Sequence, residues 1–198
     1  MNSLICSVNR IIEIIKYSWK AKGRHGIHSP FVYELVDQCF RIHVAKNLQK
    51  ELASKMRIHL STAKCIYQLI EHLNVNCLVS SKTLTIDRIS DLFGETKVAS
   101  PIIHSDFTLQ STDLKQMLVV ISMGDIESNG FEFLIQFIES LKEDTIIVLD
   151  NIRRDSNSFD TWHQFITMEQ IHFSADLFNF GLLAKRTFQE KEHFILRY

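Results

Sequence analysis

The first twenty residues carry a helical hydrophobic pattern. Apolar residues recur at spacings of three and four from Leu4 to Trp19, so they share one face of a helix predicted over residues 3–20. The charged residues of this stretch lie mostly off that stripe. Such a helix docks on its own domain or on a partner chain, and a homodimer through it is one expectation. A membrane-surface helix is less favoured, because only three basic residues support it.

The stretch from Lys20 to Pro30 combines two glycines, a proline and five basic or imidazole side chains. The glycines can end the first helix, and Ser29 before Pro30 suits the start of the next, as N-cap and first helical residue. Three further helices are expected: one from Pro30 that buries side chains as far as Phe40, a polar one within 43–60, and one from Ser61 or Thr62 to Leu73.

After residue 74, short apolar runs alternate with helical patterns, which indicates parallel β-α units. The expected strands are 77–80, 97–99 or 102–103, 117–122, 145–150, 171–175, 178–185 and 193–198. The expected helices are 84–93, 129–142 and 158–168. The last two strands are predicted to pair as an antiparallel hairpin. We therefore expect an N-terminal helical extension over 1–74 and an α/β domain over 75–198, together forming one compact unit.

Composition narrows the class of protein. The chain is 45% hydrophobic, which excludes disorder for most of its length, and 22 Lys and Arg against 23 Asp and Glu argue against a nucleic-acid partner. No uninterrupted apolar run is long enough for a secretory leader or a membrane span. The four cysteines have apolar neighbours and no metal-binding spacing, so they are predicted to be buried thiols of a cytoplasmic protein. They are Cys6, Cys39, Cys65 and Cys77.

Three segments carry a family resemblance. The heptapeptide 25–31 reads His-Gly-Ile-His-Ser-Pro-Phe, the chain closes with the segments 176–183 and 191–198, and Trp162 lies between them. Together they resemble a bacterial group of class I S-adenosylmethionine-dependent methyltransferase-like proteins, over about residues 17–40 and 117–198. The resemblance implies a Rossmann-like, mostly parallel sheet with helices on both faces, a final antiparallel strand, and ligands at the carboxyl ends of the strands.

The cofactor region departs from this family. Members that bind S-adenosylmethionine are expected to have a glycine-rich turn after the first strand, where the backbone approaches the cofactor. Here the segment 78–85 contains no glycine. By the resemblance, Ser80, Ser81 and Lys82 occupy the altered cofactor positions. Asp106 is the one obvious acid left for the ribose, and an ordinary loop or capping role is the favoured alternative for it.

The resemblance also suggests a metal site. Related metal-dependent O-methyltransferases hold Mg²⁺ with an Asp at the end of the fourth strand and an Asp-Asn pair at the end of the fifth, because a hard cation requires several oxygen ligands. Asp150 and Asn151 match the pair. At the first Asp position this chain has Ser122, and Asp125 could substitute only if the loop shifts. A complete metal site is therefore not expected.

The loop that contains Arg24, His25 and His28 is a candidate ligand site. Its imidazoles could act as a general base or clamp an anion over the ligand edge of the sheet. The alternative is a loop whose side chains brace the two flanking helices. The remaining histidines with apolar neighbours are expected to be structural: His163, His172 and His193.

The leading functional hypothesis is a divergent methyltransferase-like protein whose cofactor site is degraded. Such a protein would transfer few or no methyl groups, and it would act by binding an unknown small molecule or protein. S-adenosylmethionine enters by family resemblance only, and no bound cofactor is expected. The alternatives are an active small-molecule methyltransferase with an atypical cofactor site, and a non-enzymatic interaction or anion-binding module.

Overall fold

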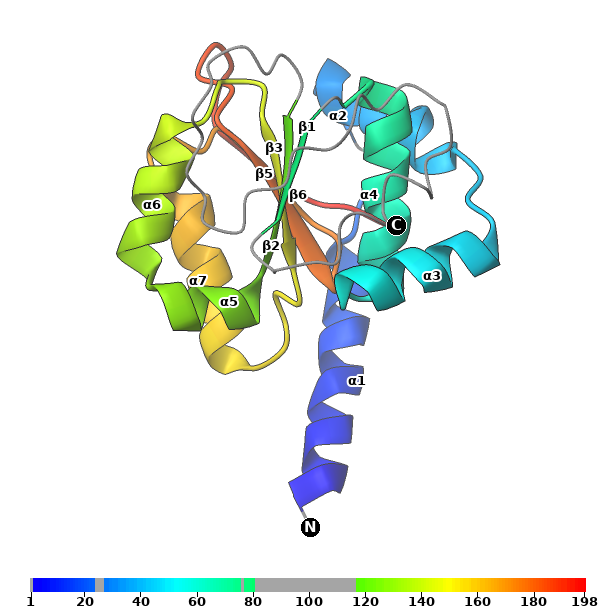
Figure 1. Ribbon diagram of the computed structural model, residues 1–198. Coiled ribbons are helices and arrows are strands. Elements are labelled where there is room, and N and C mark those ends of the chain that lie inside the picture. The colour runs from blue at the N-terminus through cyan, green and yellow to red at the C-terminus, as the bar shows by residue number, and fades with distance from the viewer. Residues whose placement is uncertain (1, 24–26, 76, 81–116) are drawn as a thin grey trace.

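The computed structural model describes residues 2–23, 27–75, 77–80 and 117–198, and within them it has a six-stranded sheet (Figure 1). The strands are β1 (Cys77–Ser80), β2 (Met117–Ser122), β3 (Ile146–Asp150), β4 (Phe173–Asp176), β5 (Phe180–Ala184) and β6 (Glu192–Ile195). Their order across the sheet is β1-β2-β3-β5-β4-β6. Only β5 runs against the others. The expected mixed α/β architecture with a mostly parallel sheet is confirmed.

Helices cover both faces of this sheet (Figure 1). One layer contains α2 (Pro30–Asp37), a 3-10 turn (Cys39–Arg41), α3 (Lys46–Met56) and α4 (Leu60–Leu73). The other layer contains α5 (Met123–Asn129), α6 (Phe131–Ser140) and α7 (Ser156–Thr167). Helix α1 (Asn2–Lys20) projects away from both layers. No helix in the described parts of the chain has the length and apolar character needed to cross a bilayer.

The core consists of two hydrophobic clusters, one on each face of the sheet. Side chains alternate along a strand, so Leu118 and Val120 pack with α2–α4 while Val119 and Ile121 pack with α5–α7. This explains why the central strands are continuous apolar runs in the sequence. The prediction of buried thiols is confirmed for the three cysteines whose side chains are described, Cys39, Cys65 and Cys77.

Trp162 of α7 packs directly over β5. A Cβ atom at Gly181 would lie 2.4 Å from the Trp162 ring, so this strand position has room only for glycine. Trp162 is fully buried. The indole therefore fixes how closely α7 approaches the sheet.

The predicted hairpin of the last two strands is wrong. β5 pairs with β3 on one side and with β4 on the other, so neither of its edges is left for β6. The hairpin is instead formed by β4 and β5, and the tight turn between them places Phe178 at a φ of 70°. β6 runs parallel to β4 on the outer side, so the final strand is not the antiparallel one that the resemblance implies, and β5 has that role instead.

Some helix boundaries also differ from expectation. Helix α2 begins as predicted, with Ser29 as N-cap residue and Pro30 in the first turn. Helix α4 begins earlier than predicted, because the ring of His59 caps it by accepting a hydrogen bond from the Ser61 amide. Helix α5 was not expected. The elements predicted at 84–93 and 97–103 lie outside the described residues.

The segment after α1 is attached to the outer edge of the sheet. The Lys22 amide donates to the Ile195 carbonyl at 2.8 Å, and the Arg197 amide donates to the Lys22 carbonyl at 3.0 Å. Ala21 is buried at this junction. The carboxyl end of α1 is therefore fixed to β6 by main-chain hydrogen bonds.

Candidate functional site

Polar residues end the three neighbouring parallel strands. Ser80, Ser122 and Asp150 are the last residues of β1, β2 and β3, and all three are buried. In the strand register, Ser122 lies opposite Asp150. The residue two positions before each of them belongs to the cluster beneath α4, so the three side chains face the same side of the sheet. This carboxyl edge is the place where open α/β sheets bind ligands.

The Asp150 carboxylate is tied to the start of α4. Its Oδ1 accepts a hydrogen bond from the Thr62 hydroxyl and a longer one, 3.4 Å, from the His59 amide. Asp150 is completely buried. An anion at a helix N-terminus is favoured by the aligned peptide dipoles and by the amides that have no partner within the helix. Asp150 therefore joins β3 to α4.

The neighbouring residues extend this arrangement into a polar rim. The His59 Nδ1 lies 2.8 Å from the Ser61 hydroxyl, which also accepts a hydrogen bond from the Asn179 side-chain amide at 3.3 Å. Asn179 belongs to the turn between β4 and β5, and its carbonyl accepts from the Ile152 amide. The start of α4, the end of β3 and this turn are thereby held together.

A glycine and an arginine border the same edge. A Cβ atom at Gly124 would lie 2.9 Å from Nη1 of Arg154 and 4.0 Å from the Ser122 hydroxyl oxygen. The Arg154 guanidinium therefore lies beside the end of β2. It also donates to the neighbouring Asp155 carboxylate at 2.7 Å. The carboxyl edge thus has a cation close to Ser122, although sequence reasoning did not single out Arg154.

The residues predicted to bind a metal are placed as follows. Ser122 lies opposite Asp150, Asn151 has a left-handed backbone with a φ of 62°, and Asp125 lies in the first turn of α5. Within the described ranges, no three His, Cys, Asp or Glu side chains gather closely enough to hold a metal ion. The metal role of Asp150 and Asn151 stays a prediction.

The other predicted site residues are only partly described. Ser80 is buried at the end of β1, whereas the remaining proposed cofactor positions, Ser81, Lys82 and Asp106, lie outside the described residues. His28 is exposed just before α2. Its predicted loop partners, Arg24 and His25, also lie outside the described residues. The anion-binding loop therefore stays a prediction.

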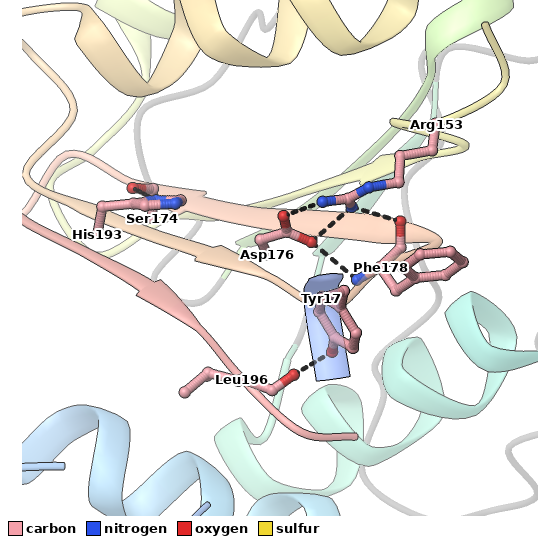
Figure 2. A network of polar contacts seen from close by, with 7 residues as sticks. All are labelled: Tyr17, Arg153, Ser174, Asp176, Phe178, His193 and Leu196. Carbon is pink, nitrogen blue, oxygen red and sulfur yellow. Dashed lines mark hydrogen bonds and ion pairs between the residues drawn. The ribbon is translucent and has the colours of Figure 1, made fainter. Parts of the chain in front are cut away.

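A second polar cluster lies beyond the end of β4 (Figure 2). Arg153 forms a two-pronged ion pair with the buried Asp176, and its Nη1 lies 2.7 Å from Oδ1. The same Nη1 donates to the Phe178 carbonyl at 2.8 Å, and the Phe178 amide donates back to Asp176 at 2.8 Å. These bonds hold the β4–β5 turn in its left-handed conformation.

Tyr17 connects α1 to this cluster (Figure 2). Its ring lies 5.2 Å from the Phe178 ring, and its hydroxyl donates to the Leu196 carbonyl. Burial raises the pKa of Tyr17, and the nearby Asp176 carboxylate raises it further, so the hydroxyl stays protonated as a donor. The cluster therefore forms the contact between the carboxyl-terminal end of α1 and the body of the protein.

His193 lies on the neighbouring strand, β6. Its Nδ1 is 2.9 Å from the Ser174 hydroxyl, and its ring lies 6.2 Å from the Trp162 ring. Burial lowers the pKa of His193, while the Asp176 carboxylate opposes that shift. A neutral imidazole in these contacts fits the structural role that was predicted for His193.

Sequence reasoning missed the Arg153–Asp176 pair and Tyr17. One signal was present, because Arg153 follows the singled-out Asp-Asn pair by two positions and Asp176 ends a short apolar strand. No local spacing connects either residue to Tyr17. A scan against protein-family models, a search of curated proteins and a search of solved structures all give no match for this chain.

Proposed function

We propose that the chain is a divergent member of the class I S-adenosylmethionine-dependent methyltransferase superfamily. It no longer transfers methyl groups, and it acts by binding a small molecule or a protein. The heptapeptide 25–31 and the closing segments support the family. A mostly parallel sheet with helices on both faces and one antiparallel strand near its carboxyl end supports a Rossmann-like fold of this type.

The contact between Asp150 and α4 is the main support for the proposal that the carboxyl edge of the sheet no longer binds a metal and substrate for methyl transfer. In a metal-dependent relative, an aspartate at this strand end would direct its oxygens toward the cation and the substrate. Here Oδ1 receives the Thr62 hydroxyl and the His59 amide. A carboxylate that joins a strand to a helix is less able to orient a ligand, because moving it would disrupt the fold.

The strand beside Asp150 supports the same proposal. Ser122 supplies a neutral hydroxyl opposite Asp150, where the resemblance implies a second carboxylate. Hard divalent cations prefer sites with several charged oxygens. The Arg154 guanidinium lies beside Gly124 near the end of β2 and pairs with Asp155, so this charged pair adds no net negative charge that would attract a cation.

Titration calorimetry with S-adenosylmethionine and with its demethylated product tests this function. We expect no binding of either compound at submillimolar concentration, and no transfer of a labelled methyl group to small catechol or phenol acceptors. An active methyltransferase assayed in parallel verifies the reagents. Micromolar binding of either compound, or acceptor labelling above the background without protein, would overturn the proposal.

A thermal-shift titration with Mg²⁺ tests the metal part separately. A cation that binds the native state must raise the melting temperature, so we expect no rise at millimolar Mg²⁺. A rise that disappears in Asp150→Asn but persists in Asp160→Asn would contradict the proposal. Asp160 is a matched control because it is an exposed acid on α7.

A further inference from the structure

Helix α1 presents its apolar residues to solvent. Ile11, Ile12, Ile15 and Trp19 are 55%, 43%, 53% and 90% exposed. Helical spacing places them on one face, since each residue advances by about 100° around the axis. No described part of the chain covers this face, which we call the α1 stripe.

The opposite face of α1 is the one that contacts the body of the protein. Tyr17, which lies across the helix from the α1 stripe, packs on Phe178 and donates to Leu196. Arg10 and Glu13, also off the stripe, line a cavity of about 350 Å³ together with residues 153–156 and 159–160. The contacts between α1 and the body therefore lie on the polar side of the helix, across from the α1 stripe.

The exposed area is large for a single chain. The four residues of the α1 stripe expose on the order of 500 Å² of apolar surface, comparable to the largest apolar patch of a typical monomer. Two such faces packed together would bury roughly 1,000 Å², which is about the minimum for a biological interface and is typical of a weak dimer. Most of the stability of a helix in a protein comes from the packing of its apolar face, and α1 lacks that contribution while the stripe is uncovered.

We propose that the α1 stripe is covered by the α1 stripe of a second copy of this chain, with the two helices antiparallel. β-branched isoleucines at spacings of three and four are the side chains that pack well between two helices. Lys16 and Lys20 lie in the carboxyl half of α1, and residues 1–9 contain no charged side chain. An antiparallel pair keeps the lysines of the two copies apart and opposes the helix dipoles, whereas a parallel pair would bring like charges together.

A lipid surface is the competing occupant, and charge argues against it. Helices that lie on membranes usually have a polar face rich in lysine and arginine. The polar side of α1 carries the acid Glu13 beside Arg10, and it faces Asp155 and Asp160 across the cavity. The cavity is lined by three acids and by three arginines, Arg10, Arg153 and Arg154, so it presents no net positive charge to anionic lipid.

Sedimentation equilibrium of the full chain tests the dimer. We expect the wild type to dimerise at micromolar to tens of micromolar concentration. Ile15→Glu places a charge in the interface and is expected to weaken association at least tenfold. Phe188→Glu is the matched control, because Phe188 is 66% exposed outside α1, and it should associate like the wild type. Both variants should keep the wild-type circular dichroism spectrum.

Three results would overturn the proposal. One is a wild type that stays monomeric at about 100 µM, far above the expected dissociation constant. Another is a monomeric wild type that floats with vesicles of anionic and zwitterionic phospholipid while Ile15→Glu does not float. That result would show that the α1 stripe binds a membrane. Equal association of the wild type and Ile15→Glu would also contradict it.

A distance measurement tests the antiparallel arrangement. A spin label on Lys20→Cys in a Cys6→Ser background should report a separation of roughly 17 Å between copies. Two antiparallel helices that pair about Ile15 offset their Lys20 positions by about 15 Å along the axis and lie about 8–10 Å apart. The described thiols should stay unlabelled, because burial raises the pKa of Cys39 to about 12 and also raises those of Cys65 and Cys77. A separation of about 10 Å or less, the distance between two helix axes, would show a parallel pair and contradict the arrangement.

Discussion

Helices α1 and α4 have the same kind of sequence pattern, but the apolar face of α1 is exposed and that of α4 is buried. Both carry apolar residues at spacings of three and four along one face. In α4 that face lies on the sheet, and Ile66 is completely buried. In α1 the face points away from the protein, and Ile15 is more than half exposed.

The difference lies in how each helix is attached. The start of α4 is joined to the central strand β3 through Asp150 and Thr62, so the helix is laid across the sheet. The end of α1 is joined to the outermost strand through Tyr17 and Lys22, and the rest of the helix runs beyond the sheet. An apolar stripe thus predicts a buried face, but the attachment points decide what buries it.

Truncating one isoleucine in each helix should give the largest difference. Ile66→Ala creates a cavity in the core and is expected to lower the free energy of unfolding by about 2–5 kcal/mol. Ile15→Ala removes a solvent-exposed side chain and should change the same quantity by about 0.5 kcal/mol or less. Urea unfolding at submicromolar protein, where association is negligible, measures both.

Protein concentration sharpens the same comparison. If α1 pairs with a second copy, the melting temperature of the wild type should rise with concentration, because association stabilises the native state. That rise should be smaller in Ile15→Ala and unchanged in Ile66→Ala. A large loss of stability in dilute Ile15→Ala would show that α1 is covered by its own chain.

Removing the attachment of α4 should have a smaller effect. Asp150→Ala leaves the Thr62 hydroxyl and the His59 amide without their carboxylate, and we expect it to cost about 1–3 kcal/mol of unfolding free energy. Asp160→Ala, in an exposed acid, should cost about 0.5 kcal/mol or less. Equal stability of the two variants would contradict the structural role of Asp150 and restore it as a candidate ligand residue.

Much of the fold was predictable because its signals are local. The strands at 117–122 and 145–150 are continuous apolar runs, and the start of α2 follows from the pair Ser29 and Pro30. The predicted hairpin of the last two strands is wrong because one partner of β5 is β3, which is distant from it in the sequence. β3 and β4 occupy both its edges, and nothing near residues 187–190 records this.

The candidate site was predictable only in part for the same reason. Asp150 could be singled out because a polar residue directly after a buried strand is a local signal. Its partner Thr62 precedes it by 88 residues, and Tyr17 meets Leu196 across 179 residues. Such contacts depend on how the helices pack on the sheet. The sequence pattern therefore identifies candidate residues but not their contact partners.

Acidification should loosen α1 before α4, which is the smallest effect expected. His193 is partly exposed on the edge strand, and desolvation of the covered part of its ring lowers its pKa below the ordinary 6.5, with His163 and Arg153 acting in the same direction and Asp176 opposing them. Above about pH 6.5 the imidazole is neutral in both the folded and the unfolded chain, so its full contribution to stability is present. As the pH falls from there toward the lower pKa of the folded state, the unfolded chain binds the proton first and stability declines. The β6 strand that contains His193 accepts the Lys22 amide at Ile195, and Leu196 directly after it accepts the Tyr17 hydroxyl. Charging the His193 ring should therefore weaken the attachment of α1. Hydrogen exchange at pH 7.5 and pH 5.5, corrected for the intrinsic rates, should show a larger loss of protection at the Lys22 amide than at amides in the middle of α4.

In His193→Gln, where the side chain can still bond to Ser174 but does not titrate, this difference should shrink. An equal loss of protection at both places would show that the two helices respond to acid together and that His193 does not control the attachment of α1.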